Sequence, residues 1–110
     1  MNNKFPNIPN LRTLDLMADD YNLQKLEAVT KALGSETRLE ILRFLSTHTS
    51  TVSEIAEALD LPQSTATLHI NTLAKAGLIE TNLHPATRGL QKVCARIFDR
   101  IVIQLPAELE

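Results

Sequence analysis

Residues 52–77, VSEIAEALDLPQSTATLHINTLAKAG, predict two short helices joined by a tight turn. Apolar side chains recur at helical spacing on one face of each helix: Ile55, Ala56 and Leu59 in the first, then Ala66, Ile70 and Leu73 in the second. Between them, Asp60 is poor at continuing a helix, and Pro62 has the fixed φ and missing N–H that suit a helix start. Leu61 is expected to form an apolar contact between the two helices. The stretch therefore predicts a helix-turn-helix.

Short side chains that donate and accept hydrogen bonds cover most of the opposite face of the second helix. This face comprises Gln63, Ser64, Thr67, Leu68 and Asn71, with Thr65 near its edge. No Asp, Glu, Lys or Arg occurs between residues 63 and 74, although charged residues are usual on a solvated helix face. A DNA-reading helix inserts its N-terminal residues into the major groove. The pattern favours base reading over the alternative of an ordinary solvated face.

A β-hairpin is predicted directly after this motif. Gly77 is placed to end the second helix, and residues 78–83, LIETNL, alternate as a strand does. Residues 84–89, HPATRG, supply a polar turn with a basic residue, and residues 91–105, QKVCARIFDRIVIQL, are rich in β-branched side chains. A helix-turn-helix followed by such a hairpin with a basic tip indicates a winged helix.

These stretches resemble the ArsR-type winged-helix transcriptional regulators. The resemblance runs through KALGSETRLEILRFL (residues 31–45), through residues 52–80 and through the hairpin, and it covers roughly residues 23–105. It implies a homodimeric DNA-binding repressor, often released from its operator by a metal or another ligand. The expected fold is mainly α with a small β-sheet (α+β), a winged helix-turn-helix of about four helices plus an antiparallel β-hairpin wing.

Two further helices are predicted ahead of the motif. Asp19 or Asp20 can cap the first, which runs to about residue 33, and Ser35 can cap the second, residues 36–46. Thr51 and Glu54 have capping-box spacing at the start of the following helix, where Ser53 is a competing cap. The expected inward-facing residues are Leu23, Leu26, Val29 and Leu33 in the first helix, and Leu39, Ile41, Leu42 and Leu45 in the second.

The ends of the chain are expected to lie outside this unit. Residues 1–19 predict an N-terminal arm, partly irregular, in which residues 13–17 can form a short strand paired near residues 101–105. Residues 20–105 are expected to form the winged helix-turn-helix, and residues 106–110 a tail or a truncation point. Residues 101–103, IVI, are more apolar than a solvated strand requires. They favour a core strand or, equally, a dimer seam formed with the first helix.

The charge distribution reconciles DNA binding with an acidic chain. A length of 110 residues fits one domain, with 44% apolar and 22% charged residues. The net charge of −2 alone opposes a nucleic-acid partner. However, residues 1–62 carry a net charge of −3 and residues 63–100 a net charge of +3. Positive charge therefore gathers on the second helix of the motif and the hairpin, where it can engage phosphates.

Roles at a DNA interface follow from side-chain chemistry. Base edges or phosphates are expected to bond to Gln63, Ser64, Thr65, Thr67 and Asn71. Leu68 can meet a thymine methyl group or pack on a neighbouring helix. Arg88 at the wing tip is expected in the minor groove or on the backbone, with Thr87 and Gly89 allowing close approach. Lys92 and Arg96 are expected to neutralise phosphates, or else to be solvated strand residues, and Arg38 and Lys75 are weaker candidates.

Metal, cofactor and enzyme readings find little support. Metal-responsive members of the family that this chain resembles carry paired cysteines in the first helix of the motif, but here that helix reads SEIAEALD. Cys94 is expected to be a buried small hydrophobe, and His48, His69 and His84 share no ligand spacing. No cofactor and no catalytic motif are predicted. One cysteine allows no internal disulfide, and no apolar leader or span occurs, so a cytoplasmic location is expected.

Two hypotheses of function follow. The first is a sequence-specific DNA-binding transcriptional regulator, with repression the expected sign, that acts as a homodimer on an inverted-repeat operator. In it, self-association uses the first helix and the C-terminal strand, and the effector, if there is one, is not specified. The alternative is a winged-helix module that binds another protein without binding DNA.

Overall fold

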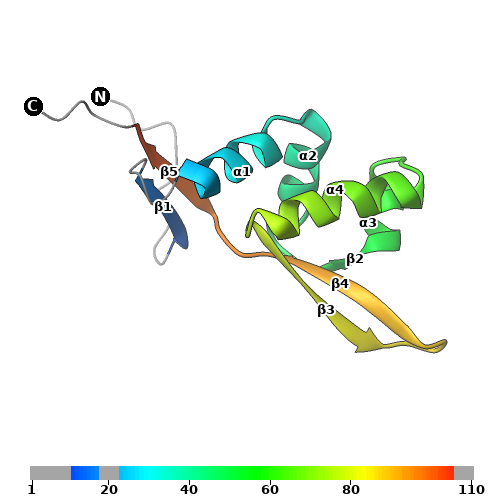
Figure 1. The fold of residues 1–110 in the computed structure, drawn as a ribbon. Coiled ribbons are helices and arrows are strands. Elements are labelled where there is room, and N and C mark those ends of the chain that lie inside the picture. Colours follow the sequence, from blue (N-terminus) through cyan, green and yellow to red (C-terminus); the bar gives the residue numbers. More distant parts are fainter. Residues whose placement is uncertain (1–10, 18–22, 106–110) are drawn as a thin grey trace, which may run out of the picture.

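The computed structural model, described for residues 11–17 and 23–105, has four helices packed above a long β-hairpin (Figure 1). The elements are β1 (Thr13–Met17), α1 (Leu23–Leu33), α2 (Glu36–Phe44), β2 (Ser50–Thr51), α3 (Val52–Ala58), α4 (Gln63–Lys75), β3 (Ile79–Pro85), β4 (Leu90–Arg96) and β5 (Arg100–Gln104). One sheet has the antiparallel order β2-β4-β3, and a second pairs β1 with β5. The predicted α+β winged helix-turn-helix is confirmed. No described helix has the length and apolarity that a membrane crossing would need.

Local capping defines the two helices of the motif. The Thr51 N–H donates to Glu54 Oε1 and the Glu54 N–H donates to Thr51 Oγ1, so the predicted capping box begins α3. At its end, the Leu61 N–H donates to the Ala56 carbonyl at 2.8 Å, while Asp60 adopts a positive φ of 54°. This is the Schellman pattern. It turns the chain sharply enough that α4 can start at the next residues.

The same pattern ends α4 and directs the chain into the wing. The Gly77 N–H donates to the Ala74 carbonyl, and the Leu78 N–H donates to the Leu73 carbonyl, both at 3.0 Å. Gly77 has a φ of 78°, a left-handed conformation in which a side chain would be strained. The predicted role of Gly77 in ending the helix is confirmed, and β3 starts two residues later.

The core lies where α1, α2, α3 and α4 meet the base of the hairpin. Ala66, Ile70 and Leu73 are fully buried, which confirms the predicted inward face of α4. Ile41, on α2, and Ile55, on α3, are also fully buried. The principal apolar faces of the motif therefore converge on one core, and the opposite face of α4 is left outside.

Two residues predicted to face inward are exposed. Leu39 is 48% exposed because Ile41 defines the buried face of α2, and a shift of two residues turns a side chain about 200° round a helix. Leu23 is 49% exposed because the buried face of α1 is centred on Val29 and Ala32, and Leu23 lies about 120° from Val29 round the helix. The expected caps at Asp19 and Asp20 lie outside the described residues.

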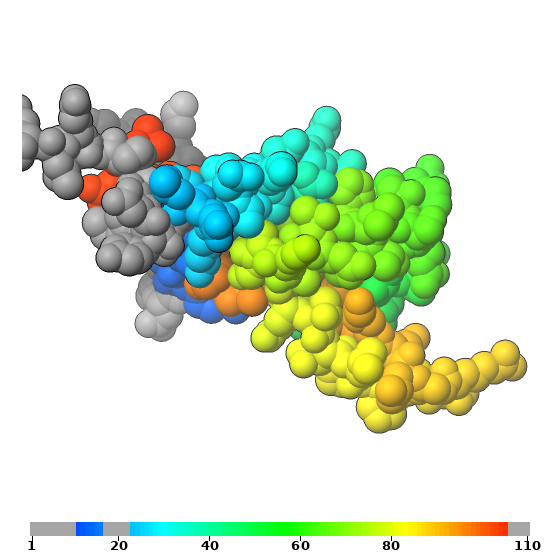
Figure 2. Space-filling view, viewed as in Figure 1, coloured from blue at the N-terminus to red at the C-terminus, as the bar shows by residue number. Residues whose placement is uncertain are grey.

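The wing is a regular hairpin that extends well beyond the helices (Figures 1 and 2). Strands β3 and β4 pair from Ile79↔Arg96 to Pro85↔Leu90. His84 and Pro85, expected in the turn, instead continue β3 because Gln91 and Leu90 remain opposite them. The turn is closed by the Ala86 N–H, which donates to the Gly89 carbonyl at 2.9 Å, and Gly89 has a φ of 73°. The basic tip is therefore carried on a longer arm than predicted.

The expected N-terminal strand is present and pairs with β5 in parallel, from Thr13↔Arg100 to Met17↔Gln104. The two strands form a separate sheet, rather than the edge of the wing sheet, because residues 97–99 turn the chain away from β4. Leu14 and Leu16 are buried, and the register places them beside Ile101 and Ile103. An apolar face of this small sheet thus extends the core beneath α1.

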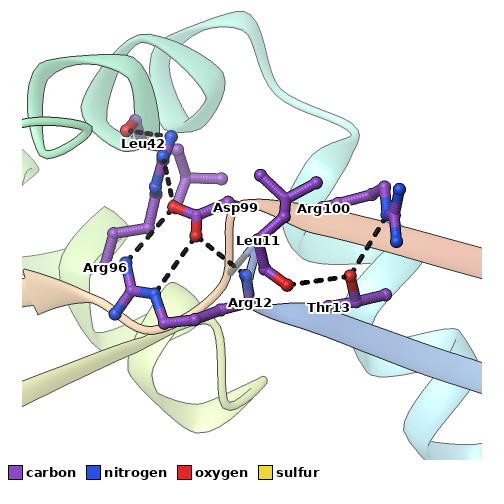
Figure 3. A network of polar contacts seen from close by, with 7 residues as sticks. All are labelled: Leu11, Arg12, Thr13, Leu42, Arg96, Asp99 and Arg100. Carbon is purple, nitrogen blue, oxygen red and sulfur yellow. Dashed lines mark hydrogen bonds and ion pairs between the residues drawn. The ribbon is translucent and has the colours of Figure 1, made fainter. Parts of the chain in front are cut away.

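Asp99 joins the two sheets through a network of polar contacts (Figure 3). The Arg12 guanidinium donates to both carboxylate oxygens at 3.2 Å, and the Arg12 backbone N–H donates at 3.1 Å. Arg96 Nη2 donates to Asp99 Oδ1 at 2.9 Å. These bonds, led by that of the Arg12 guanidinium, hold the pKa of Asp99 well below its usual range. The link between β4 and β5 is therefore fastened to β1.

Replacing Asp99 with asparagine should lower the free energy of unfolding by about 1–2 kcal/mol, because Arg96 would lose its charged partner in a site only partly screened by water. A carboxylate with a lowered folded pKa stabilises the fold above its unfolded pKa, and this stabilisation is lost as the pH falls through the folded value. The wild type should therefore lose stability below about pH 4, and Asp99→Asn should lose less over the same interval. Urea unfolding at several pH values tests this. Asp15→Asn, a matched change at an exposed carboxylate of β1, is the control, and equal behaviour of the two variants would contradict the role of Asp99.

Candidate nucleic-acid interface

The predicted reading face of α4 is open to solvent. Gln63, Ser64 and Asn71 are exposed, and Leu68 is 69% exposed. Thr65 and Thr67 are half-buried at its margins. Thr67 Oγ1 donates to the Gln63 carbonyl at 2.9 Å, which leaves its lone pairs to accept. The face is thus free to meet base edges, as its sequence pattern indicates.

The N-terminal end of α4 has backbone donors to spare. Pro62 occupies the N-cap position, and no side chain caps this end among the described residues. The first bond of the helix runs from the Ala66 N–H to the Pro62 carbonyl at 3.0 Å. The N–H groups of residues 63–65 precede that bond and need partners from water or a ligand. They add positive potential where the reading face begins.

A hollow of about 340 Å³ lies between this end of α4 and strand β4 of the wing. It is lined by Val52, Ser53, Gln63, Thr67, Leu90, Gln91 and Lys92. Within it, Ser53 Oγ donates to Gln63 Oε1 at 3.3 Å. The hollow brings together three predicted site residues, Gln63, Thr67 and Lys92. The other four were not singled out by sequence, because their proximity depends on how the wing folds back beneath the motif.

The wing carries the remaining predicted contacts at two distances from the helices. Thr87 and Arg88 lie exposed in the turn, beyond the last pair of the hairpin. Lys92 lies two pairs closer to the core, opposite Leu83. The hairpin extends past α3 and α4 (Figure 2). The hollow reaches Leu90 of the last pair but is not lined by residues 86–89 of the turn. The structure therefore offers two separate basic contact points, one in the hollow and one at the tip.

Arg96 corrects an expectation from the sequence. Its side chain is only 20% exposed, and its guanidinium bonds to Asp99 and donates to the Leu42 carbonyl at 3.4 Å. The register places Arg96 opposite Ile79, at the base of the hairpin against α2. The guanidinium is therefore committed to the fold, and we assign it no phosphate contact.

Arg38, a weaker candidate, has a similar structural role. It donates to the Ala32 and Lys31 carbonyls at 2.7 and 2.8 Å, at the end of α1, and its Nη1 lies 3.2 Å from His69 Nδ1. Arg38 thereby connects the end of α1 to α4.

Cys94 is fully buried in β4, and burial raises the pKa of its thiol. The predicted role of a small buried hydrophobe is confirmed. Within residues 11–17 and 23–105, no three His, Cys, Asp or Glu side chains come together as a metal site.

Comparisons with known proteins point to regulators of transcription. A family profile described as a helix-turn-helix domain matches residues 33–82. The transcriptional activator HlyU of Vibrio cholerae is 31% identical over 74 residues, which are 67% of this chain and 68% of HlyU. The helix-turn-helix-type regulator MJ1325 of Methanocaldococcus jannaschii is 40% identical over 58 residues, 52% of this chain. The match spans 65% of MJ1325, just under two thirds of its length.

Among solved structures with the same fold, one is an ArsR family regulator and another is a homodimer. The ArsR family transcriptional regulator RHA00566 is 33% identical with a TM-score of 0.56, and the match covers 66% of this chain and 75% of that one. The winged helix-turn-helix DNA-binding domain of Mb0332 from Mycobacterium bovis, described as homodimeric, is 27% identical with a TM-score of 0.62. That match covers 70% of this chain and 68% of the other.

Proposed function

The chain belongs to the ArsR family of winged helix-turn-helix transcriptional regulators, and we propose that it binds a specific DNA operator as a homodimer. The observation that carries this proposal is the exposed, uncharged face of α4, which lies beside the hollow and the basic wing. A reading helix in the major groove and a wing on the neighbouring backbone use both features. No catalytic role is part of the proposal, and the protein would act in the cytoplasm, where DNA is accessible.

An apolar surface on α1 and β5 supports self-association. Leu23 is 49% exposed, Val102 43%, Ile103 37% and Leu105 73%. Exposed leucines are common singly, but Leu23 is on α1, Val102 and Ile103 are on β5 of the small sheet, and Leu105 follows β5. These elements lie at the end of the molecule opposite the wing tip (Figure 1). The homodimeric Mb0332 domain shows that a similar fold assembles in pairs. Two copies joined here would place two α4 helices in successive major grooves, about 34 Å apart on an inverted repeat.

The sign of regulation depends on where the operator lies. We propose repression, in which the bound dimer excludes polymerase from an overlapping promoter. The related HlyU is named an activator, so a reporter assay with the operator placed upstream of, and then within, a promoter distinguishes the two signs.

Selection of bound duplexes from a random pool tests the proposed function. An enriched inverted repeat is expected, with half-sites one helical turn apart. Retention should weaken steeply as salt rises, because phosphate contacts release counterions. If no sequence is enriched and retention on DNA does not depend on salt, the chain is not a DNA-binding regulator, and a protein-binding winged helix becomes the better account.

Asn71→Ala and Arg88→Ala should weaken DNA binding in different ways. Asn71 lies on the reading face of α4, so its replacement should reduce the free energy of DNA binding by about 1–3 kcal/mol at particular base pairs. Arg88 lies at the wing tip, so its replacement should weaken binding to all sequences alike. It should also reduce the slope of log affinity against log salt concentration by about one unit. Titrations on the operator and on a scrambled duplex, each at several salt concentrations, separate these effects. Equal losses on both duplexes for Asn71→Ala would remove base reading from this residue.

A further inference from the structure

The hollow lies between α4 and β4, the helix and the wing strand that the proposed function places on DNA. In B-form duplex the major and minor grooves are separated by a sugar-phosphate backbone. A protein with α4 in the major groove and the wing tip at the minor groove must straddle that backbone. The space available for it is the hollow, since its walls belong to the N-terminal ends of α3 and α4 on one side and to β4 on the other.

The polar lining suits a phosphate. Lys92 supplies a cation, and the side-chain amides of Gln63 and Gln91 supply N–H groups that donate hydrogen bonds. None of the described residues that line the hollow is acidic. The nearby Glu54 accepts a bond from the Thr51 N–H at 2.9 Å, which turns its carboxylate toward the start of α3. An anion in the hollow therefore meets one positive charge and several donors.

The Ser53–Gln63 hydrogen bond orients one of those donors. Ser53 Oγ donates to Gln63 Oε1 at 3.3 Å, so the Nε2 group of Gln63 is left to donate elsewhere. A glutamine that reads adenine uses both its oxygen and its nitrogen. With its oxygen engaged, Gln63 is better suited to a phosphate oxygen, which only accepts. Ser53 is thus a positioning residue for Gln63.

The apolar lining suits the sugar. Val52 and Leu90 line the same hollow, and Leu90 is 62% exposed on β4. Deoxyribose presents C–H groups beside each phosphate, and an apolar side chain can pack against them. A free phosphate ion would make no use of these walls, whereas a sugar-phosphate unit uses the polar and apolar parts together.

We propose that this hollow receives one sugar-phosphate unit of the DNA backbone in each half-site, with Lys92 and Gln63 at the phosphate, Ser53 holding Gln63 in place and Leu90 at the sugar. This inference rests on the proposed function and adds to it a fixed register. One defined phosphate would set how far along the groove α4 is placed. Such contacts position a protein on DNA without reading sequence.

Single methylphosphonate substitutions, which remove the charge of one phosphate at a time, test the proposal on the selected operator. With the wild type, a methylphosphonate at one position per half-site, the phosphate that occupies the hollow, should lower affinity about tenfold. With Lys92→Gln, affinity for unmodified operator should fall by a similar factor. The methylphosphonate at that position should then lower the affinity of the variant by less than about twofold more, because Lys92 and that phosphate interact. Lys75→Gln, at the C-terminal end of α4 and not among the residues that line the hollow, is the matched control. Its loss of affinity should multiply with the loss caused by the methylphosphonate.

A second variant keeps the test decisive if Lys92→Gln alters the fold. Ser53→Ala should reduce the effect of the same methylphosphonate about two- to threefold, and Ser53→Thr, which keeps the hydroxyl, should restore it. Independent losses at every phosphate for both Lys92→Gln and Ser53→Ala would overturn the hollow as a backbone site while leaving DNA binding intact. Failure of the wild type to bind any duplex would instead overturn the proposed function.

Discussion

Replacing Leu23 with aspartate is expected to convert the proposed dimer into monomers and to lower affinity for the full inverted repeat at least about a hundredfold. Leu23 is 49% exposed on α1, so the substitution should cost the protomer little. In the proposed interface, however, it would bury an uncompensated charge, which is strongly unfavourable. Once the copies separate, the second half-site is no longer bound at a high effective concentration.

Sedimentation and titrations on full and half operators measure this effect. The wild type should prefer the full operator, and Leu23→Asp should bind both duplexes with similar, weak affinity. Val102→Asp, at a 43% exposed position of β5, should behave in the same way if the interface includes both elements. Leu83→Asp is the control for sedimentation, because Leu83 is 63% exposed on the wing, far from α1. A Leu23→Asp protein that remains dimeric would remove α1 from the interface.

Replacing Ile70 with alanine should lower the free energy of unfolding by about 2–5 kcal/mol, because it removes fully buried atoms and leaves a cavity. Ile70 lies on the inward face of α4, between Ala66 and Leu73, both of which are also fully buried. Loss of packing there should loosen the helix that presents the reading face. Operator affinity is therefore expected to fall as well, through a less ordered α4.

Urea unfolding at one fixed protein concentration measures the change in stability, since association contributes to the stability of a dimer. Leu68→Ala is the matched control on the same helix. Leu68 is 69% exposed, so its loss should change stability by less than about 0.5 kcal/mol. Similar destabilisation by both substitutions would contradict the assignment of inward and outward faces on α4.

The helix-turn-helix could be predicted because its signals are local. The spacing of Ala66, Ile70 and Leu73 follows one helix, and the caps at Thr51 and Gly77 lie within a few residues of the groups that they satisfy. Leu23 and Leu39 were assigned wrongly because α1 and α2 contain more leucines than one face can bury. Only packing against neighbouring helices decides which of them stay outside.

Contacts between segments that are distant in sequence could not be predicted from these local signals. The sequence predicted that Arg96 contacts a phosphate. Its guanidinium instead bonds to Asp99 and to the Leu42 carbonyl of α2, 54 residues away in sequence. The hollow was missed because Ser53 and Leu90 approach only when the wing packs beneath α3. The pairing of β1 with β5 was predicted from apolar alternation alone, while its parallel direction and its clamp at Arg12 were not.

The small parallel sheet also has a consequence for the order of folding. Arg12 and Asp99 are separated by 87 residues, so bringing β1 to β5 closes the whole intervening chain into a loop. That closure is opposed by chain entropy, whereas α3 and α4 form from neighbours in sequence. The sheet should therefore assemble last and open first, and amide hydrogens of β1 should exchange with solvent sooner than those of α4. Because the proposed pairing surface includes β5, subunit association would follow this late step.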